Sequence, residues 1–125
     1  MAAAALNLTI EQGTTFRRLL TFKDSLDADI DLTGQTFRGS IRRSVTDATA
    51  VAVFTFVVAN QISNTGEVTM TLSAAASSAI VLQTQDSAIR VSELFAYDVE
   101  RVFVDGSVER VLQGVVTLVP EATKE

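Results

Sequence analysis

The stretch LFAYDVERVFVDGSVERVLQGVVTLV, residues 94–119, decides the fold of this chain. Apolar and polar residues alternate along both of its halves, and the dipeptide Asp105-Gly106 separates the halves. Alternation with a period of two is typical of half-buried strands, and Asp-Gly is typical of a tight hairpin turn. The stretch therefore predicts two long antiparallel strands, over about 94–104 and 107–119.

The charged residues of this hairpin distinguish between two registers. A two-residue turn at Asp105-Gly106 would place Arg101 opposite Arg110, and like charges in direct opposition are unfavourable. A type I turn at Val104-Asp105, with Gly106 as the left-handed residue of a bulge, replaces this pair by attractive ones, each contributing roughly 0.2–1 kcal/mol. We therefore predict the bulged register, which gives these cross-strand pairs: Arg101 with Glu109, Glu100 with Arg110, and Val99 with Val111.

Shorter segments with the same alternation fill most of the remaining chain. We predict strands over about 6–10, 14–23, 36–43, 51–58 and 67–72, and a short extended piece at 30–32. Residues 51–58 are apolar at both parities, so we expect either a central strand that is covered on each side or a strand in the core of a sandwich. The segment SAAASSAI, residues 73–80, predicts one short helix capped by Ser73.

Seven to eight strands with one short helix near residues 73–80 predict an all-β fold, an antiparallel immunoglobulin-like β-sandwich. Alternation with apolar neighbours places the large aromatic residues in or near its core: Phe16, Phe22, Phe37, Phe54 or Phe56, and Tyr97. A chain of 125 residues has the length of one domain. We expect a flexible N-terminal lead at 1–5, the sandwich domain at 6–120, and a flexible C-terminal tail at 121–125, after Pro120 ends the last strand.

The amino-acid composition argues against the common kinds of catalytic and metal site. The chain has no histidine and no cysteine, so the familiar catalytic triads and zinc sites have no residues to form them. Its net charge is −5 and no long basic run is present, which argues against binding to nucleic acid or to an anionic membrane. We expect no enzyme activity, no cofactor and no metal.

Two patterns of carboxylate residues could indicate a metal site or an active site. Asp27, Asp29 and Asp31 have the spacing of calcium ligands, but Leu32 and Arg38 stand where an EF-hand loop requires Gly and an acid, so an acidic turn is the better interpretation. Asp98 and Glu100 share one strand face about 7 Å apart. A glycosidase would also need a sugar-binding cleft, and the chain has no Trp to line one.

Half of the ten basic residues fall in two predicted strands that we expect to be neighbours. They are Arg17, Arg18, Arg38, Arg42 and Arg43. Their side chains form either a solvated sheet face paired with nearby acids or a basic patch that docks an acidic partner protein. A nucleic-acid-binding face would also require exposed aromatic residues between the arginines, whereas the aromatic residues of this chain are predicted to lie in the core.

The chain resembles small virion proteins of tailed bacteriophages. The resemblance rests on LTIEQGTTF (residues 8–16), IDLTG (30–34) with Arg38 and Ile41-Arg42, YDVE (97–100), DGSVERVLQGVV (105–116) and VPEAT (119–123), in this order. The chain departs from that family at Gln35, where an aromatic residue is usual, and at Val104, where proline often precedes Asp-Gly. Residues 44–93 carry no part of the resemblance.

The resemblance implies a non-enzymatic β-sandwich component of the virion, in the tail, baseplate or fibre-attachment region. The leading interpretation is a tail adaptor that attaches fibres or spikes to the tail. The alternatives are a capsid decoration protein and, less favoured, a carbohydrate-binding module. The partners would be other virion proteins and copies of the chain in a symmetric ring, with the protein soluble in the host cytoplasm before assembly.

We expect docking to involve the apolar N-terminal segment, residues 1–10, and the end of the last strand with its charged tail, residues 119–125. Arginines of the two basic strands would add to this surface. The predicted docking residues are Leu6, Leu8, Arg17, Arg42, Arg43 and Pro120.

Overall fold

A computed structural model describes residues 3–82 and 92–120 of the chain. These residues form eight strands and one five-residue helix, which are β1 (Ala4–Ala5), β2 (Leu8–Glu11), β3 (Phe16–Thr21), β4 (Thr36–Arg42), β5 (Ala52–Val58), β6 (Glu67–Leu72), α1 (Ala74–Ser78), β7 (Glu93–Val102) and β8 (Val108–Val119). The predicted all-β class is confirmed. So is the short helix, because the Ser73 hydroxyl accepts a 3.1 Å hydrogen bond from the amide of Ala76.

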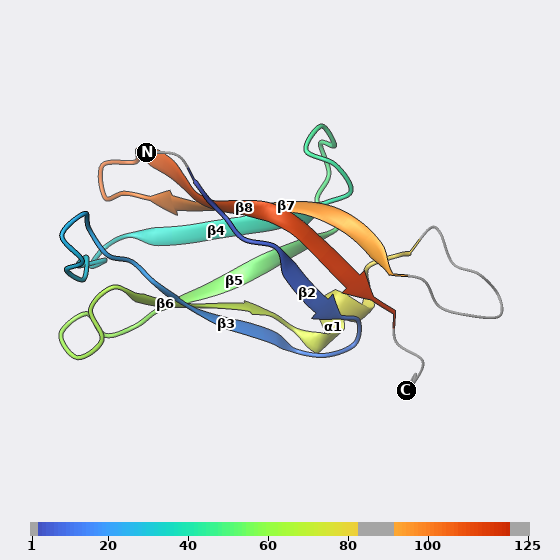
Figure 1. Cartoon of the computed structure of the whole chain (residues 1–125), viewed down its shortest axis with the longest axis horizontal. Coiled ribbons are helices and arrows are strands. Elements are labelled where there is room, and N and C mark those ends of the chain that lie inside the picture. The colour runs from blue at the N-terminus through green and yellow to red at the C-terminus, as the bar shows by residue number, and fades with distance from the viewer. Residues whose placement is uncertain (1–2, 83–91, 121–125) are drawn as a thin grey trace.

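The strands form one curled sheet in the order β1-β8-β7-β4-β5-β6-β3, with β2 also beside β8. β5 belongs to both halves of the sheet: Phe54 pairs with Gly39 of β4, whereas the following residue, Thr55, pairs with Thr71 of β6. The sheet turns over along β5, and Figure 1 shows β3, β5 and β6 on one side and β4, β7 and β8 on the other. The hydrophobic core lies between these two halves.

The N-terminal strands correct two predictions. β1 and β2 pair parallel to β8, with Ala4 opposite Leu112 and Leu8 opposite Val116, so the sheet is not antiparallel throughout. Ala4–Ala5 belong to the lead that we expected to be flexible, yet they form β1. Residues 1–2 of that lead, and the predicted tail at 121–125, lie outside the described residues.

The extended piece predicted at 30–32 is not a strand. In its place the loop between β3 and β4 contains one isolated bridge, which joins Lys23 to Asp29. Leu32 is nevertheless fully buried. The apolar residues of this segment therefore mark a loop that packs against the core, which sequence alternation alone cannot tell from a short strand.

The terminal hairpin has the predicted turn and charge pairing. Glu100 lies opposite Arg110 and Arg101 opposite Glu109. Gly106 has a φ of 90°, and its amide donates a 2.9 Å hydrogen bond to the carbonyl of Phe103, as a type I turn followed by a left-handed glycine requires. The positive φ explains why glycine occupies this position.

One pair of the predicted register is wrong. Val99 lies opposite Leu112, and not opposite Val111, because a β-bulge shifts the register between Val99 and Glu100. Beyond the bulge, Val116 and Leu118 of β8 face the core. Without the shift, the same face of β8 would have carried Gln113, so burial of apolar side chains favours the bulge.

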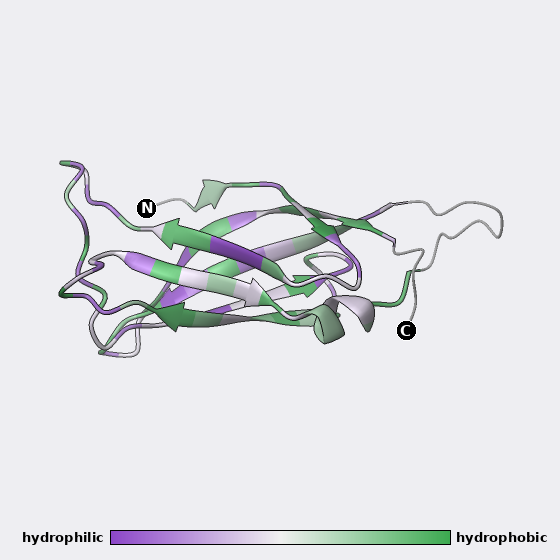
Figure 2. Ribbon diagram, turned by 90° about the horizontal axis from the view of Figure 1, so that it is seen from below, coloured by the Kyte–Doolittle hydropathy of each residue, from purple (hydrophilic) through white to green (hydrophobic). Residues whose placement is uncertain are grey.

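The predicted aromatic core is confirmed. Phe54 and Tyr97 are buried, and the other rings are partly buried against the core: Phe16, Phe22, Phe37 and Phe56. They form two groups, Phe16–Phe54–Tyr97 and Phe22–Phe37–Phe56, with ring centroids 5.3–6.2 Å apart. Hydrophobic and hydrophilic residues alternate along the strands in Figure 2, as expected where one face of each strand is buried.

β5 is not covered on both sides. Val53 and Val57 are 60% and 67% exposed, although β5 has neighbours on either edge. The outer face of the β3–β6–β5 half therefore carries exposed aliphatic side chains. Leu19 of β3 and Val57 both lie opposite Thr69 of β6, so they belong to one row across this face.

The N-terminal chain runs alongside β8 and comes closest to it beside Gly114. A Cβ atom at this position would overlap the carbonyl oxygen of Leu6 and lie 3.0 Å from the Asn7 side-chain oxygen. Two hydrogen bonds hold this close approach, from the Leu6 amide to the Gln113 carbonyl (3.0 Å) and from the Val115 amide to Asn7 Oδ1 (3.1 Å). Only glycine allows this approach.

We predict that Gly114→Ala destabilises the protein by about 1–3 kcal/mol, because the new methyl group pushes the backbone at Leu6 away from β8. Chemical denaturation measures the loss, and hydrogen exchange should show faster exchange at the Leu6 amide. Gln113→Ala, on the adjacent exposed position, is the control. Equal stability of the two variants would contradict the close approach.

Candidate partner-docking surfaces

The predicted N-terminal docking residues lie along β8. Leu6 is half-buried, and its carbonyl accepts a hydrogen bond from the Tyr97 hydroxyl. Leu8 is 3% exposed and belongs to the core. The side chain of Leu8 therefore cannot contact a partner, and its prediction as a docking residue is wrong. Alternation explains the difference, because β2 turns Leu8 inward and its neighbour Thr9 outward.

Tyr97 connects the core to the N-terminal chain. Its ring packs edge-on against Phe54, and its hydroxyl reaches Leu6. Burial raises the pKa of this hydroxyl, and the charge of Arg18 opposes the rise. The neutral hydroxyl is therefore the stable form within the fold, and it can donate the hydrogen bond that holds the N-terminal chain at Leu6.

A groove of about 610 Å³ lies on the outer face of β4, β7 and β8. Small outward-facing residues, Ser40 and Ala96, lie on its floor, and Val45 from the loop after β4 lines it too. The remaining lining residues are Ala5, Arg42, Tyr97, Asp98, Arg110, Gln113, Gly114 and Val115. The groove brings Ala5 of the N-terminal segment and Arg42 together. Sequence reasoning missed the other lining residues, for which small outward side chains on adjacent strands were the available signal.

The two arginines at the end of β4 mainly fix neighbouring loops. Arg42 Nη1 donates to the carbonyls of Asp47 (3.1 Å) and Ala48 (2.7 Å). Arg43 donates to the carbonyl of Val81, pairs with Glu93 at 3.7 Å and lies over the Phe95 ring. Their guanidinium groups lie at the surface, but part of their hydrogen-bonding capacity is used within the chain.

The predicted basic patch does not form across neighbouring strands. β5 and β6 lie between β3 and β4 in the sheet, so Arg17 and Arg18 are separated from Arg38 and Arg42. Arg17 is exposed on β3, which ends the strand order. Pro120 follows β8 directly and is half-buried. The structure thus brings Leu6 and Arg42 to the β8 side of the molecule, and it places Arg17 on the opposite half.

The carboxylates of the candidate chemical sites have other partners. Asp29 pairs with Lys23 at 2.9 Å, and Asp31 accepts hydrogen bonds from Thr33. Those bonds lower the pKa of Asp31. Within residues 3–82 and 92–120, no group of three or more His, Cys, Asp or Glu lies close enough to hold a metal ion. The DxDxD segment is an acidic loop held by its own hydrogen bonds.

The two strand-face carboxylates of β7 are paired with different arginines. Glu100 accepts a 2.7 Å hydrogen bond from Arg38 of β4, and Asp98 lies 3.3 Å from Arg110 of β8. Glu100 thus lies opposite Arg110 of β8 in the strand register, but its side chain bonds Arg38 of β4, which is the strand on the other edge of β7. These pairs join β4, β7 and β8 across the outer face of the sheet.

Comparisons with known proteins leave the family open. No protein-family model matches the chain, and no curated protein matches it. Among solved structures, the chain is similar to one described as Tim-1, with a TM-score of 0.39 and 11% sequence identity, covering 99% of this chain and 100% of that one. No helix among the described residues is long and apolar enough to cross a membrane.

We predict that Tyr97 ionises above pH 10, since burial raises its pKa above the unperturbed value of about 10. It is the only tyrosine and the chain has no tryptophan, so an ultraviolet absorbance titration reports this residue alone. Because the folded pKa is higher than the unfolded one, the stability that it contributes is present below about pH 10 and is lost as the pH rises further. Tyr97→Phe should lose about 1 kcal/mol at neutral pH and lack this alkaline component.

We predict that a chelator leaves the melting temperature unchanged, because Asp29 and Asp31 are satisfied by Lys23 and Thr33. Calorimetry with and without EDTA measures this. A fall of many degrees would show that the acidic loop binds a cation.

Proposed function

We propose that this chain is a non-enzymatic structural protein of a tailed-bacteriophage virion, a tail adaptor that attaches fibres or spikes to the tail. The observation that carries the proposal is the ordered sequence resemblance to small virion proteins. Fold alone would not identify a function, because one β architecture supports many. For the fold itself we propose an immunoglobulin-like sandwich, in which the two halves of the curled sheet act as its layers.

The segments that carry the resemblance are neighbours in space. LTIE forms β2, YDVE lies in the middle of β7, and the DG turn leads into β8. β8 pairs with β2 on one side and with β7 on the other, so residues separated by up to 108 positions are hydrogen-bonded. One hydrogen-bonded surface therefore contains most of the resemblance, which supports reading the fragments as one pattern.

Several surfaces suit assembly. β3 ends the strand order, and an edge strand can pair with a strand of another chain. The groove between Ala5 and Arg42 offers a concave site for a partner segment. Exposed aliphatic side chains, such as Val53 and Val57, provide apolar contact area. The partners would be tail-tube or fibre proteins and further copies of the chain in a symmetric ring.

Labelling the protein in purified phage particles tests the proposal. An affinity tag on the chain, detected by gold or by added density in electron micrographs, should lie on the tail. A label distributed over the head would support a capsid decoration protein instead. Absence of the chain from purified particles would exclude both structural roles.

We predict that deletion of residues 1–5 spares folding but weakens incorporation into particles. The deletion removes the two-residue β1 and Ala5 of the groove, while β2 and the close approach of Leu6 to Gly114 remain. Circular dichroism and melting check the fold, and immunoblots of particles measure incorporation. Leu94→Ser, at an exposed position outside the groove, is the control. Normal incorporation of the truncated chain would show that the N-terminal segment is not part of the docking surface.

A further inference from the structure

Three loops meet at one end of the molecule, and each carries a highly exposed aliphatic side chain. They are the β3–β4 loop (residues 22–35), the β5–β6 loop (59–66) and the β7–β8 turn (103–107), which lie together in Figure 1 at the end away from α1. Leu26 is 87% exposed, Ile62 97% and Val104 76%. We call these three loops the loop end.

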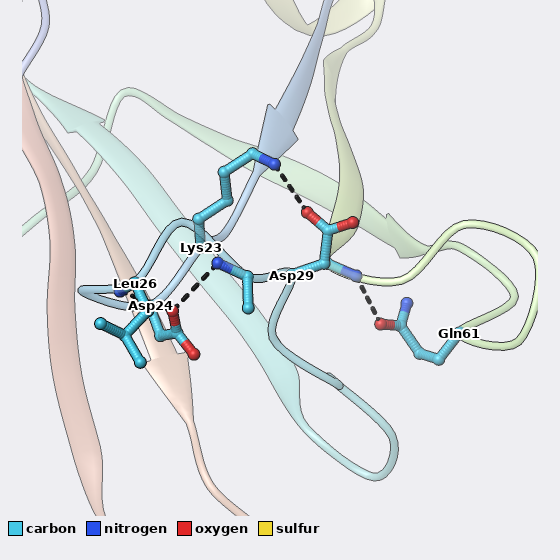
Figure 3. Close-up of polar contacts among 7 residues, drawn as sticks. Lys23, Asp24, Leu26, Asp29 and Gln61 are labelled. Carbon is cyan, nitrogen blue, oxygen red and sulfur yellow. Dashed lines mark hydrogen bonds and ion pairs between the residues drawn. The ribbon is translucent and has the colours of Figure 1, made fainter.

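Hydrogen bonds join two of the loops through Gln61. Its side-chain oxygen accepts from the amides of Leu32 (3.0 Å) and Gly66 (2.8 Å), and its amide nitrogen donates to the Ala59 carbonyl at 2.7 Å. Figure 3 shows Gln61 reaching across to the β3–β4 loop. The third loop is also close, because a Cβ on Gly34 would lie 3.0 Å from a methyl group of Val104.

The position of Leu26 is fixed within its own loop. The Asp24 carboxylate accepts hydrogen bonds from the amides of Leu26 (2.8 Å) and Ala28 (3.0 Å), and Lys23 bonds Asp29 at 2.9 Å, as Figure 3 shows. The backbone that carries this leucine is therefore held in one shape. A surface that is already ordered loses little conformational entropy when it binds.

Exposed aliphatic side chains on ordered loops are unfavourable in water and favourable in an interface. Burying a side chain such as leucine or isoleucine contributes roughly 1.5–3 kcal/mol. Three of them at one end can anchor a contact, since a few central residues supply most of the energy of an interface. The three anchors come from three different loops, so a partner must contact all of the loop end to bury them.

The charge of the loop end indicates the kind of partner. Its five aspartates and one lysine give a net charge of −4; the aspartates are Asp24, Asp27, Asp29, Asp31 and Asp105. Hydrogen bonds from Thr33 and Ser107 lower the pKa of Asp31 and Asp105, so these two remain ionised at neutral pH. Apolar contacts within an acidic rim match a protein surface with apolar pockets and a rim of Lys and Arg.

A second copy of this chain is a poorer match. At the opposite end, Arg42 bonds the carbonyls of Asp47 and Ala48, and Arg43 bonds Val81 and pairs with Glu93. Arg42 is held by backbone carbonyls and Arg43 is paired with Glu93, and the chain as a whole carries a net charge of −5. The charge pattern therefore favours a different protein.

We propose that the loop end is the surface by which this chain docks onto a second, basic virion protein, with Leu26, Ile62 and Val104 as apolar anchors. This rests on the proposed function and adds a site separate from the groove and the N-terminal segment. The loop end would bind one partner while the β8 side binds another, as a protein that joins two components requires.

Incorporation into particles tests the docking surface. The double variant Leu26→Asp/Ile62→Asp should lower incorporation about tenfold or more, equivalent to 1.4 kcal/mol or more. Val81→Asp is the control, because Val81 is an exposed aliphatic residue at the opposite end. Both variants change exposed positions, so their melting temperatures should stay close to that of the unchanged protein.

A photo-crosslinking amino acid at position 62 identifies the occupant. In assembled particles it should crosslink to a different virion protein, at a peptide that contains Lys or Arg, and the same amino acid at position 81 should not. A crosslink to a second copy of this chain would overturn the proposed partner. Asp27→Asn gives a matched charge variant, because asparagine tolerates the φ of 65° at this position, and it should weaken incorporation more at low salt than at high salt, where the lost charge is screened in any case.

The outcomes separate the two proposals. If the unchanged protein is absent from particles, the proposed function fails, and the docking surface that depends on it fails too. If the unchanged protein is present and the double variant is incorporated as well as Val81→Asp, only the docking surface is wrong.

Discussion

The close approach of the N-terminal chain to Gly114 is the constraint on which the rest of the structure depends. β8 pairs with β7 on one edge and with β1 and β2 on the other, and the N-terminal chain changes from β1 to β2 at Leu6 and Asn7. The Asn7 side chain and the Tyr97 hydroxyl satisfy backbone groups at this point. Tyr97 also packs on Phe54, so one side chain connects the aromatic core, the sheet edge and the wall of the groove.

Local rules were sufficient for the features that depend on a few neighbouring residues. The charges of Glu100, Arg101, Glu109 and Arg110 selected the hairpin register near its turn, and Ser73 marked the start of α1. The alternation of apolar and polar residues also placed Phe37 of β4 in or near the core, because a strand with one buried face must keep its period of two. These features required no knowledge of which strands are neighbours.

Features that depend on the arrangement of the strands could not be predicted by these local rules. Apolar residues at both parities predicted a β5 that is covered on each side or lies in the core of a sandwich, but Val53 and Val57 are 60% and 67% exposed. Arg17 and Arg42 are similar in sequence context, yet two strands separate β3 from β4. The bulge at Val99 could have been predicted from the sequence. Leu112, Gly114, Val116 and Leu118 are at even positions, whereas the polar Gln113 is at an odd position, so only the shifted register turns these apolar residues of β8 inward. The groove and the loop end could not be predicted, since both combine segments far apart in the chain.

The pairing of the two chain ends has a consequence for how the protein folds during synthesis. β1 and β2 emerge from the ribosome well before their hydrogen-bonding partner, β8. The aliphatic residues of β2 therefore cannot be buried until β8 has been synthesised, and folding through contacts between such distant residues is slow. Until β8 is released, Leu8 and Ile10 have no sheet to join. The nascent chain is consequently exposed to aggregation, and a chaperone or rapid completion of synthesis would protect it.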